Sequence, residues 1–93
     1  TMSTRSPTLL LLMAEHEYRT TLTVEEAGER YWGYTPAHSR RLANEGSFPV
    51  PAFRASDSRK APWLVLIHDL AAHLDTCRQQ AVKEREALRR ASV

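Results

Sequence analysis

The side chains best suited to chemistry in this sequence are arginines, and they stand in two places. Arg40 and Arg41 are adjacent in a segment that also carries Asn44, and Arg59 and Lys60 follow a stretch rich in serine. Arginine can hydrogen-bond guanine O6 and N7 together, and asparagine can pair in a similar way with adenine. Basic and hydroxyl side chains bind phosphate oxygens. These residue types indicate nucleic-acid binding.

The distribution of charge supports this interpretation more than its sum does. The chain of 93 residues has a formal net charge of only +2. Residues 35–60, however, hold five basic and two acidic residues, whereas residues 1–34 hold three basic and five acidic ones. An ordinary solvated face is the alternative. We expect the DNA-contacting side chains to be basic, hydroxyl or amide groups of the middle block: Thr35, His38, Arg40, Arg41, Asn44, Arg54, Ser56, Ser58, Arg59 and Lys60.

Catalytic and metal chemistry find little support in the residues. His73 and Cys77 are four apart, a spacing that can share a metal on a helix, but zinc usually takes four ligands and Cys77 is the one cysteine. No motif places a nucleophile beside Asp69 and His73, and the three glycines form no phosphate-binding loop. We therefore expect no enzyme, no metal and no cofactor. A single cysteine also excludes an internal disulfide and fits a reducing cytoplasm.

Two short helices must position the adjacent arginines. A threonine followed three residues later by glutamate predicts the start of a helix over 24–32, and Gly33 predicts its end. A Thr-Pro pair then predicts a second helix over 35–45, which Gly46 ends. Two helices joined by a tight, glycine-containing turn are typical of a helix-turn-helix. The second helix should bury one face and leave the arginines outward; the expected core face is Ser39, Leu42 and Ala43.

The segments around this pair are predicted with less regular patterns. Prolines keep 47–51 extended, and segments 52–54 and 63–66 have strand character on either side of a polar loop, which predicts a β-hairpin. The short apolar run Leu9–Met13 is expected as a buried strand, and 16–22 as a loop or short extended piece. The aromatic residues could stack on bases. They flank the hinges between elements, however, so we expect them in the core: Tyr31, Trp32, Phe48, Phe53 and Trp63.

The last helix is predicted from Ile67 toward Arg90, since no proline or glycine interrupts the chain after Pro62. Its apolar stripe runs through Leu70, Leu74, Cys77 and Ala81 and thins to Leu88. About 22 residues make a helix of roughly 33 Å, which is longer than the core of so short a chain can cover. We therefore expect a homodimer or higher assembly on DNA, with this helix or the strand at Leu9–Met13 as the contact.

Five segments, taken in order, resemble the pyocin activator protein PrtN family within the MerR, excisionase and AlpA-like group. They are Leu10-Leu11-Leu12-Met13-Ala14, Tyr31-Trp32-Gly33, Ser58-Arg59-Lys60-Ala61-Pro62-Trp63-Leu64-Val65, Ile67-His68-Asp69-Leu70-Ala71 and Leu74-Asp75. The stretch from Thr35 to Pro49 also resembles the segment of that group that runs from the recognition helix into the wing. The resemblance implies a phage-derived activator that binds DNA upstream of tail-like bacteriocin genes.

The sequence thus predicts an α+β protein: a small winged helix-turn-helix with a β-hairpin wing and a long C-terminal helix. We expect one domain over residues 8–90 behind a flexible segment 1–7, with no signal peptide or membrane span, in the cytoplasm at the nucleoid. The expected partners are double-stranded promoter DNA and RNA polymerase. Two alternatives stay open: an excisionase-like architectural factor of the same fold, and a protein-interaction adaptor that uses the long helix.

Overall fold

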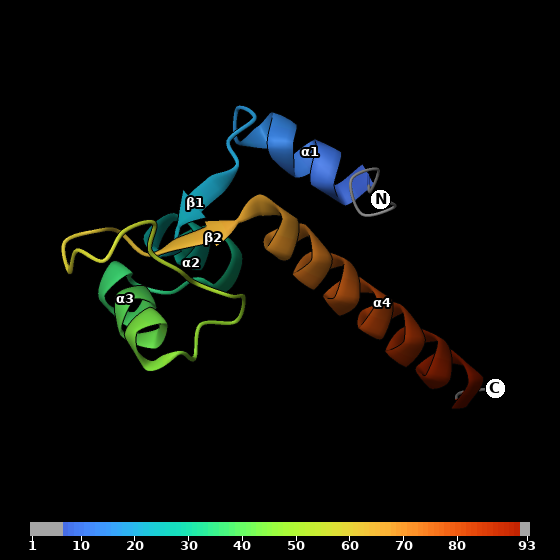
Figure 1. Cartoon of the computed structure of the whole chain (residues 1–93). Coiled ribbons are helices and arrows are strands. Elements are labelled where there is room, and N and C mark those ends of the chain that lie inside the picture. Colours follow the sequence, from blue (N-terminus) through green and yellow to red (C-terminus); the bar gives the residue numbers. More distant parts are fainter. Residues whose placement is uncertain (1–6, 92–93) are drawn as a thin grey trace.

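Residues 7–91 form four helices and two short strands (Figure 1). The structure, a computed structural model, describes residues 7–91. The elements follow in the order α1 (Pro7–Glu15), β1 (Thr21–Thr23), α2 (Val24–Trp32), α3 (Pro36–Glu45), β2 (Leu64–Leu66) and α4 (Ile67–Ala91). The α+β class and the long C-terminal helix are confirmed. Of the segment predicted to be flexible, residues 1–6 lie outside the described part, and Pro7 is the first residue of α1.

Helices α2 and α3 begin and end where local chemistry predicts. The Thr23 hydroxyl accepts a hydrogen bond from the Glu26 N–H at 3.1 Å, and the Glu26 carboxylate accepts one from the Thr23 N–H at 3.0 Å. At the start of α3 the Thr35 hydroxyl accepts the His38 N–H, and Pro36 occupies the first turn, where a missing N–H has no cost. Gly33 and Gly46 end the two helices with φ of 71° and 73°, a left-handed conformation that glycine adopts without strain.

The expectation of a strand at Leu9–Met13 is wrong, because this segment lies within the helix α1. Leu9 and Leu12 are buried, while Leu10 and Leu11 between them are exposed. That three-residue spacing belongs to a helix that covers the start of α4, whereas a strand would alternate. Leucine is also a strong helix former, and Pro7 is well suited to a first turn. The run was too short for its periodicity to show which structure it forms.

The strand pairing also differs from the expected hairpin. β2 pairs antiparallel with β1, with Leu22 opposite Val65, and both of these side chains are almost fully buried. On its other side β2 meets the segment predicted as its partner, 52–54, through a single bridge between Phe53 and Leu64. Prolines at 51 and 62 lack the N–H groups that would extend that pairing. The segment 16–22, expected as a loop or extended piece, thus supplies the paired strand through its end.

The core lies where α1, the sheet, α2 and the beginning of α4 meet. Its most buried large side chains include Leu22, Val24, Val65, Ile67 and Leu70. The expectation that the aromatic residues belong to the core is confirmed for most of them, since Phe48 is buried and Tyr31, Trp32 and Trp63 pack against the buried cluster. Among residues 7–91, no helix is long and apolar enough to cross a membrane.

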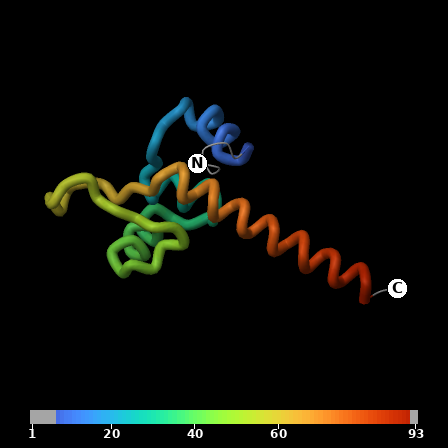
Figure 2. The backbone as a smooth tube through the Cα atoms, turned by 45° about the vertical axis from the view of Figure 1, so that its right-hand side comes forward, coloured from blue at the N-terminus to red at the C-terminus, as the bar shows by residue number. Residues whose placement is uncertain are grey.

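Helix α4 extends beyond this core from Thr76, the tenth of its 25 residues, onward. α1 packs along its first turns, where the Thr8 hydroxyl donates to Asp75 at 2.5 Å. The remainder projects away from the other elements in both backbone views (Figures 1 and 2). The molecule is accordingly elongated, with extents of 57 × 29 × 20 Å.

Candidate nucleic-acid interface

The position of α3 is set by its close contact with α2. Gly28 of α2 faces Ser39 of α3, and a Cβ added at Gly28 would lie 2.0 Å from the Ser39 hydroxyl oxygen. Only a glycine permits this approach. Ser39 is fully buried and Ala43 nearly so, while Leu42 is partly buried against the core. The expected core face of α3 is therefore confirmed, and its opposite face is left to solvent.

The exposed face of α3 carries the adjacent arginines on two different sides. Arg40 reaches back toward α2, where its Nη1 lies 3.3 Å from a carboxylate oxygen of Glu25. Arg41 instead donates from Nη2 to the Nδ1 of His38, one turn earlier, at 2.7 Å. Both arginines are exposed. Thr35 lies at the start of this face, and its hydroxyl oxygen accepts the His38 N–H at 3.1 Å while its own proton remains able to donate.

Asn44 lies at the other end of α3, and its amide is engaged within the protein. Its Oδ1 accepts a hydrogen bond from the indole Nε1 of Trp63 at 3.0 Å. The face of the same indole ring is covered by the Arg54 guanidinium, 4.5 Å from the ring centroid. Trp63 thereby connects α3 to both ends of the loop between Phe53 and Leu64. A bidentate pairing of Asn44 with adenine would compete with this hydrogen bond, since it needs the same oxygen.

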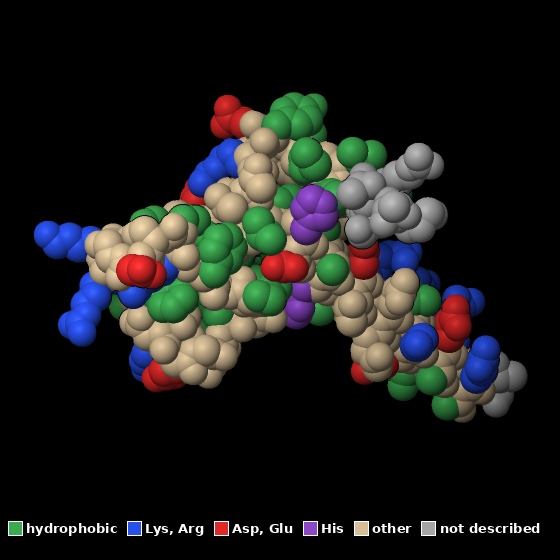
Figure 3. Space-filling model, viewed as in Figure 1, with side chains coloured by type: hydrophobic (Ala, Val, Ile, Leu, Met, Phe, Trp, Pro, Cys, Tyr) green, Lys and Arg blue, Asp and Glu red, His purple; other side chains and the backbone are tan. Residues whose placement is uncertain are grey.

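The segment 54–62, hereafter the basic loop, extends from the Phe53–Leu64 bridge. Two of its serines shape it: Ser56 Oγ accepts the Ser58 N–H at 3.2 Å, and Ser58 Oγ accepts the Lys60 N–H at 3.1 Å. Serine hydroxyls often stabilise turns in this way. Arg59 and Lys60 are exposed beyond them. Figure 3 shows basic side chains protruding at the loop end of the molecule, beside the surface to which α3 belongs.

The predicted site residues therefore gather on one end of the protein but not as one continuous cluster. Thr35, His38 and Arg41 share the exposed face of α3, whereas Arg59 and Lys60 stand at the basic loop. Arg54 is half-buried against Trp63, and its Nε has no hydrogen-bond partner among residues 7–91. Arg54 therefore packs at the base of the basic loop, against Trp63, more than it adds charge to the surface of the loop.

Two residues that matter for this geometry were not predicted from sequence as part of the site. Glu25 orients Arg40, and Trp63 joins α3 to the loop. The sequence could have indicated the role of Trp63, because a buried indole generally finds a hydrogen-bond partner. It could not have indicated the role of Glu25, because the contact of Glu25 with Arg40 depends on how α2 and α3 cross.

The pKa that is shifted most is that of Glu26, which is not one of the predicted DNA-contacting residues. Arg19 makes two hydrogen bonds to the Glu26 carboxylate at 2.8 and 2.9 Å, and the Thr23 N–H adds another. These interactions lower the pKa of Glu26 to about 2, and the Glu26 carboxylate in turn raises the pKa of Arg19. The pair stabilises the start of α2 and has a structural role.

The pair of His73 and Cys77 does come together, with Nε2 and Sγ 3.4 Å apart. Within the described part of the chain, no group of three His, Cys, Asp or Glu side chains is arranged to hold a metal ion.

The model of the family described as pyocin activator protein PrtN matches residues 8–81, which is most of the chain. No curated protein and no solved structure matches it. The matched range includes the helix pair, the basic loop and the first half of α4, and it ends near the middle of that helix.

Proposed function

The chain belongs to the pyocin activator protein PrtN family, and from that membership we propose that it activates transcription of phage-derived bacteriocin genes by sequence-specific binding to double-stranded promoter DNA. The proposed activity has no catalytic step and needs no metal or cofactor. It takes place in the cytoplasm, at the nucleoid. Activation follows from docking on promoter DNA and assisting RNA polymerase, through contact or through bending of the DNA.

The observation that carries the proposal is the exposed face of α3. A short helix that follows a tight turn, with its polar N-terminal half outward, has the form of the helix that enters the major groove in helix-turn-helix proteins. Arg41, His38 and Thr35 lie on that face with donors available. The basic loop adds two further positive charges at the same end of the molecule, where they fit an adjacent phosphate backbone or minor groove.

The two adjacent arginines have different proposed roles. Arg41 is exposed and is oriented by His38 alone on α3, so it is the proposed base-contacting residue. Arg40 is held toward α2 by Glu25, which places its guanidinium at the side of the helix, and it is the proposed phosphate contact. Asn44, held by Trp63, is proposed to maintain the angle between α3 and the basic loop.

A salt titration of duplex binding tests the role of the basic loop. Each phosphate contact contributes a slope of about −0.9 in log K against log salt. The double substitution Arg59→Ala with Lys60→Ala should weaken binding to operator and random duplex alike and flatten the slope by up to about 2. Lys83→Ala on α4 removes an exposed charge far from this end and serves as the control. An unchanged affinity and slope in the double variant would remove the loop from the interface.

Comparison of operator and random duplex tests the role of α3. Arg41→Ala should reduce the preference for the operator by about 1–3 kcal/mol, the value of one bidentate base contact. Arg40→Ala should weaken both duplexes by the same factor. Preserved preference in Arg41→Ala assigns sequence recognition to another element. Strong duplex binding without activation of a promoter reporter would support the alternative of an excisionase-like architectural factor. Absence of duplex binding would support the alternative of a protein-interaction adaptor.

A further inference from the structure

The second half of α4 has a surface that the monomer does not use. Every residue from Thr76 to Ala91 is exposed, and Leu88 retains 71% of its side-chain exposure. Sixteen residues make roughly 24 Å of helix. This stretch has only its own backbone hydrogen bonds and side-chain pairs to stabilise it, whereas most helical stability in proteins comes from packing of one face.

One face of this half has the spacing of a coiled coil. Steps of three and four residues alternate along it from the edge of the core to the end of the helix: Leu74, Cys77, Ala81, Glu84, Leu88 and Ala91. The mean repeat of 3.5 residues is the repeat that keeps one seam facing a second helix. Five of these six side chains are apolar or weakly polar, and Glu84 is the exception.

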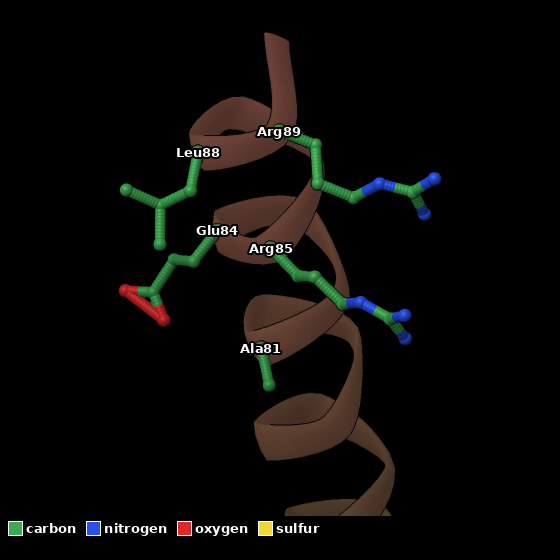
Figure 4. Close-up of a pocket in the computed structure, with 5 residues that line it drawn as sticks. All are labelled: Ala81, Glu84, Arg85, Leu88 and Arg89. Carbon is green, nitrogen blue, oxygen red and sulfur yellow. The ribbon is translucent and has the colours of Figure 1, made fainter. Parts of the chain in front are cut away.

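The surface of this seam contains a matching recess. A shallow groove of about 400 Å³ is lined by Ala81, Glu84, Arg85, Leu88 and Arg89. The first four stand at i, i+3, i+4 and i+7, which are the four corners of a hole in knobs-into-holes packing. Figure 4 shows Ala81, Glu84 and Leu88 along one edge of it and the two arginines along the other. The spacing of its lining residues is therefore the spacing of a hole that receives a side chain of another helix.

We propose that a second copy of this chain occupies this groove, with α4 of each copy paired antiparallel over residues 74–91. Charge decides the direction. In a parallel pair Glu84 would face Glu84 of the partner subunit within the seam, which is repulsive. In the antiparallel pair the two Glu84 side chains lie in neighbouring layers of the seam instead of directly opposite each other, and Arg78 and Arg85 of the partner subunit flank each carboxylate at about one turn.

The same register provides a place for the most exposed side chain of the seam. Leu88 of one copy enters the hole formed by Leu74, Cys77, Arg78 and Ala81 of the partner subunit, which has the same i, i+3, i+4, i+7 spacing. Ala81, a small knob, enters the groove beside the partner's Glu84. The seam covers about two and a half heptads, so the free dimer is weak and DNA strengthens it by binding both copies.

The antiparallel seam also predicts how the operator is arranged, and this prediction rests on the proposed DNA-binding function. It places the two α2–α3 units at opposite ends of a seam roughly 26 Å long, related by a twofold axis. Half-sites of dimeric helix-turn-helix proteins lie about 34 Å apart, one turn of DNA. The operator is therefore expected to be an inverted repeat.

Disulfide cross-linking in the absence of DNA tests the pairing and its direction. In the Leu88→Cys chain, mild oxidation should link the introduced thiol to the native Cys77 of the partner subunit, identified by peptide mapping. The unsubstituted chain, whose Cys77 faces Leu88 of the partner subunit, should give little covalent dimer. A Cys77–Cys77 disulfide in the unsubstituted chain, or a symmetrical link through position 88, would establish a parallel pair and overturn the proposal.

Sedimentation across a concentration series measures the strength of association. Leu88→Lys should raise the dissociation constant of the dimer by about tenfold or more, because it places a positive charge in the seam beside Arg78 of the partner subunit. Leu11→Lys is the matched control, since Leu11 is equally exposed at 70% but lies on α1. Circular dichroism confirms that both variants remain folded. A full-length chain that stays monomeric alone and binds an operator as one copy contradicts the proposal, whereas loss of DNA binding alone contradicts only the proposed function.

Discussion

At the scale of single residues, the start of α2 shows how one side chain serves two structural purposes. Glu26 accepts the Thr23 N–H, which completes the helix cap, and also accepts both N–H groups that Arg19 presents from the preceding turn. The carboxylate therefore fixes the entry into α2 and, through α2, the platform on which α3 packs. A bidentate arginine pair has a defined geometry that a single exposed ion pair lacks.

The pKa of Glu26 gives a prediction for stability against pH. Because that pKa is lowered in the folded protein to about 2 from an ordinary 4.5, its stabilising contribution is present above pH 4.5. It is lost as the pH falls through the folded value. Glu26→Gln should reduce the free energy of unfolding at pH 7 by about 1 kcal/mol, a value kept small by solvent exposure.

Urea unfolding at pH 7 and near pH 2 measures this difference between the Glu26→Gln and unsubstituted chains. The difference should shrink toward zero at the lower pH. Glu29→Gln is the control, since Glu29 is an exposed carboxylate of the same helix. A difference that is the same at both pH values would show that the carboxylate charge of Glu26 contributes nothing.

At the scale of elements, the contact between α2 and α3 depends on the absence of one side chain. The Ser39 hydroxyl occupies the space that a Cβ on Gly28 would need, and that hydroxyl has no hydrogen-bond partner among residues 7–91. The same glycine also accepts the Tyr34 N–H through its carbonyl at 3.0 Å, which closes the turn between the helices. Glycine has a low helix propensity, but at position 28 it is required because the two helices pack so closely.

Gly28→Ala should therefore destabilise the protein by about 1–3 kcal/mol, although alanine is the better helix former, because the helices must move apart. Combination with Ser39→Ala removes the nearer obstacle, so the double variant should recover part of the loss. The Ser39 Cβ still stands 3.1 Å from the new methyl group, which prevents full recovery. Thermal unfolding of the two single variants and the double variant measures the coupling. Additive effects would contradict the contact.

At the scale of the whole molecule, α4 joins two regions with different sources of stability. Its first turns are part of the core, with Ile67 and Leu70 fully buried, whereas its second half is entirely exposed. The folded unit thus ends well before the helix does.

Truncation after Gln80 tests this division. The shortened chain should keep the free energy of unfolding of the monomer within about 1 kcal/mol, because every residue from 81 to 91 is exposed. It should also lose self-association, since most of the proposed seam is gone. Denaturation at a concentration where the full chain is monomeric provides the comparison. A large loss of stability would show that residues 81–93 support the core.

The sequence by itself determined the features that depend on neighbouring residues. The caps at Thr23 and Thr35 and the left-handed glycines at 33 and 46 set the bounds of α2 and α3, because a cap is a bond between residues at most three or four apart. The long helix α4 followed in the same way from the lack of proline and glycine after Pro62. The exposed positions of Arg40 and Arg41 followed from helical periodicity.

Tertiary structure alone decided the features that depend on distant residues. Leu9–Met13 became helical because α4 offered a surface for two leucines three residues apart. β2 paired with β1 along three residues, which buries Leu22 beside Val65, whereas the proline-flanked segment at Phe53 forms a single bridge with β2. The different environments of Arg40 and Arg41, and the engagement of Asn44 by Trp63, likewise depend on how packed elements cross. Local chemistry cannot contain that information, since it concerns residues 15 or more positions apart that meet only after the core has formed.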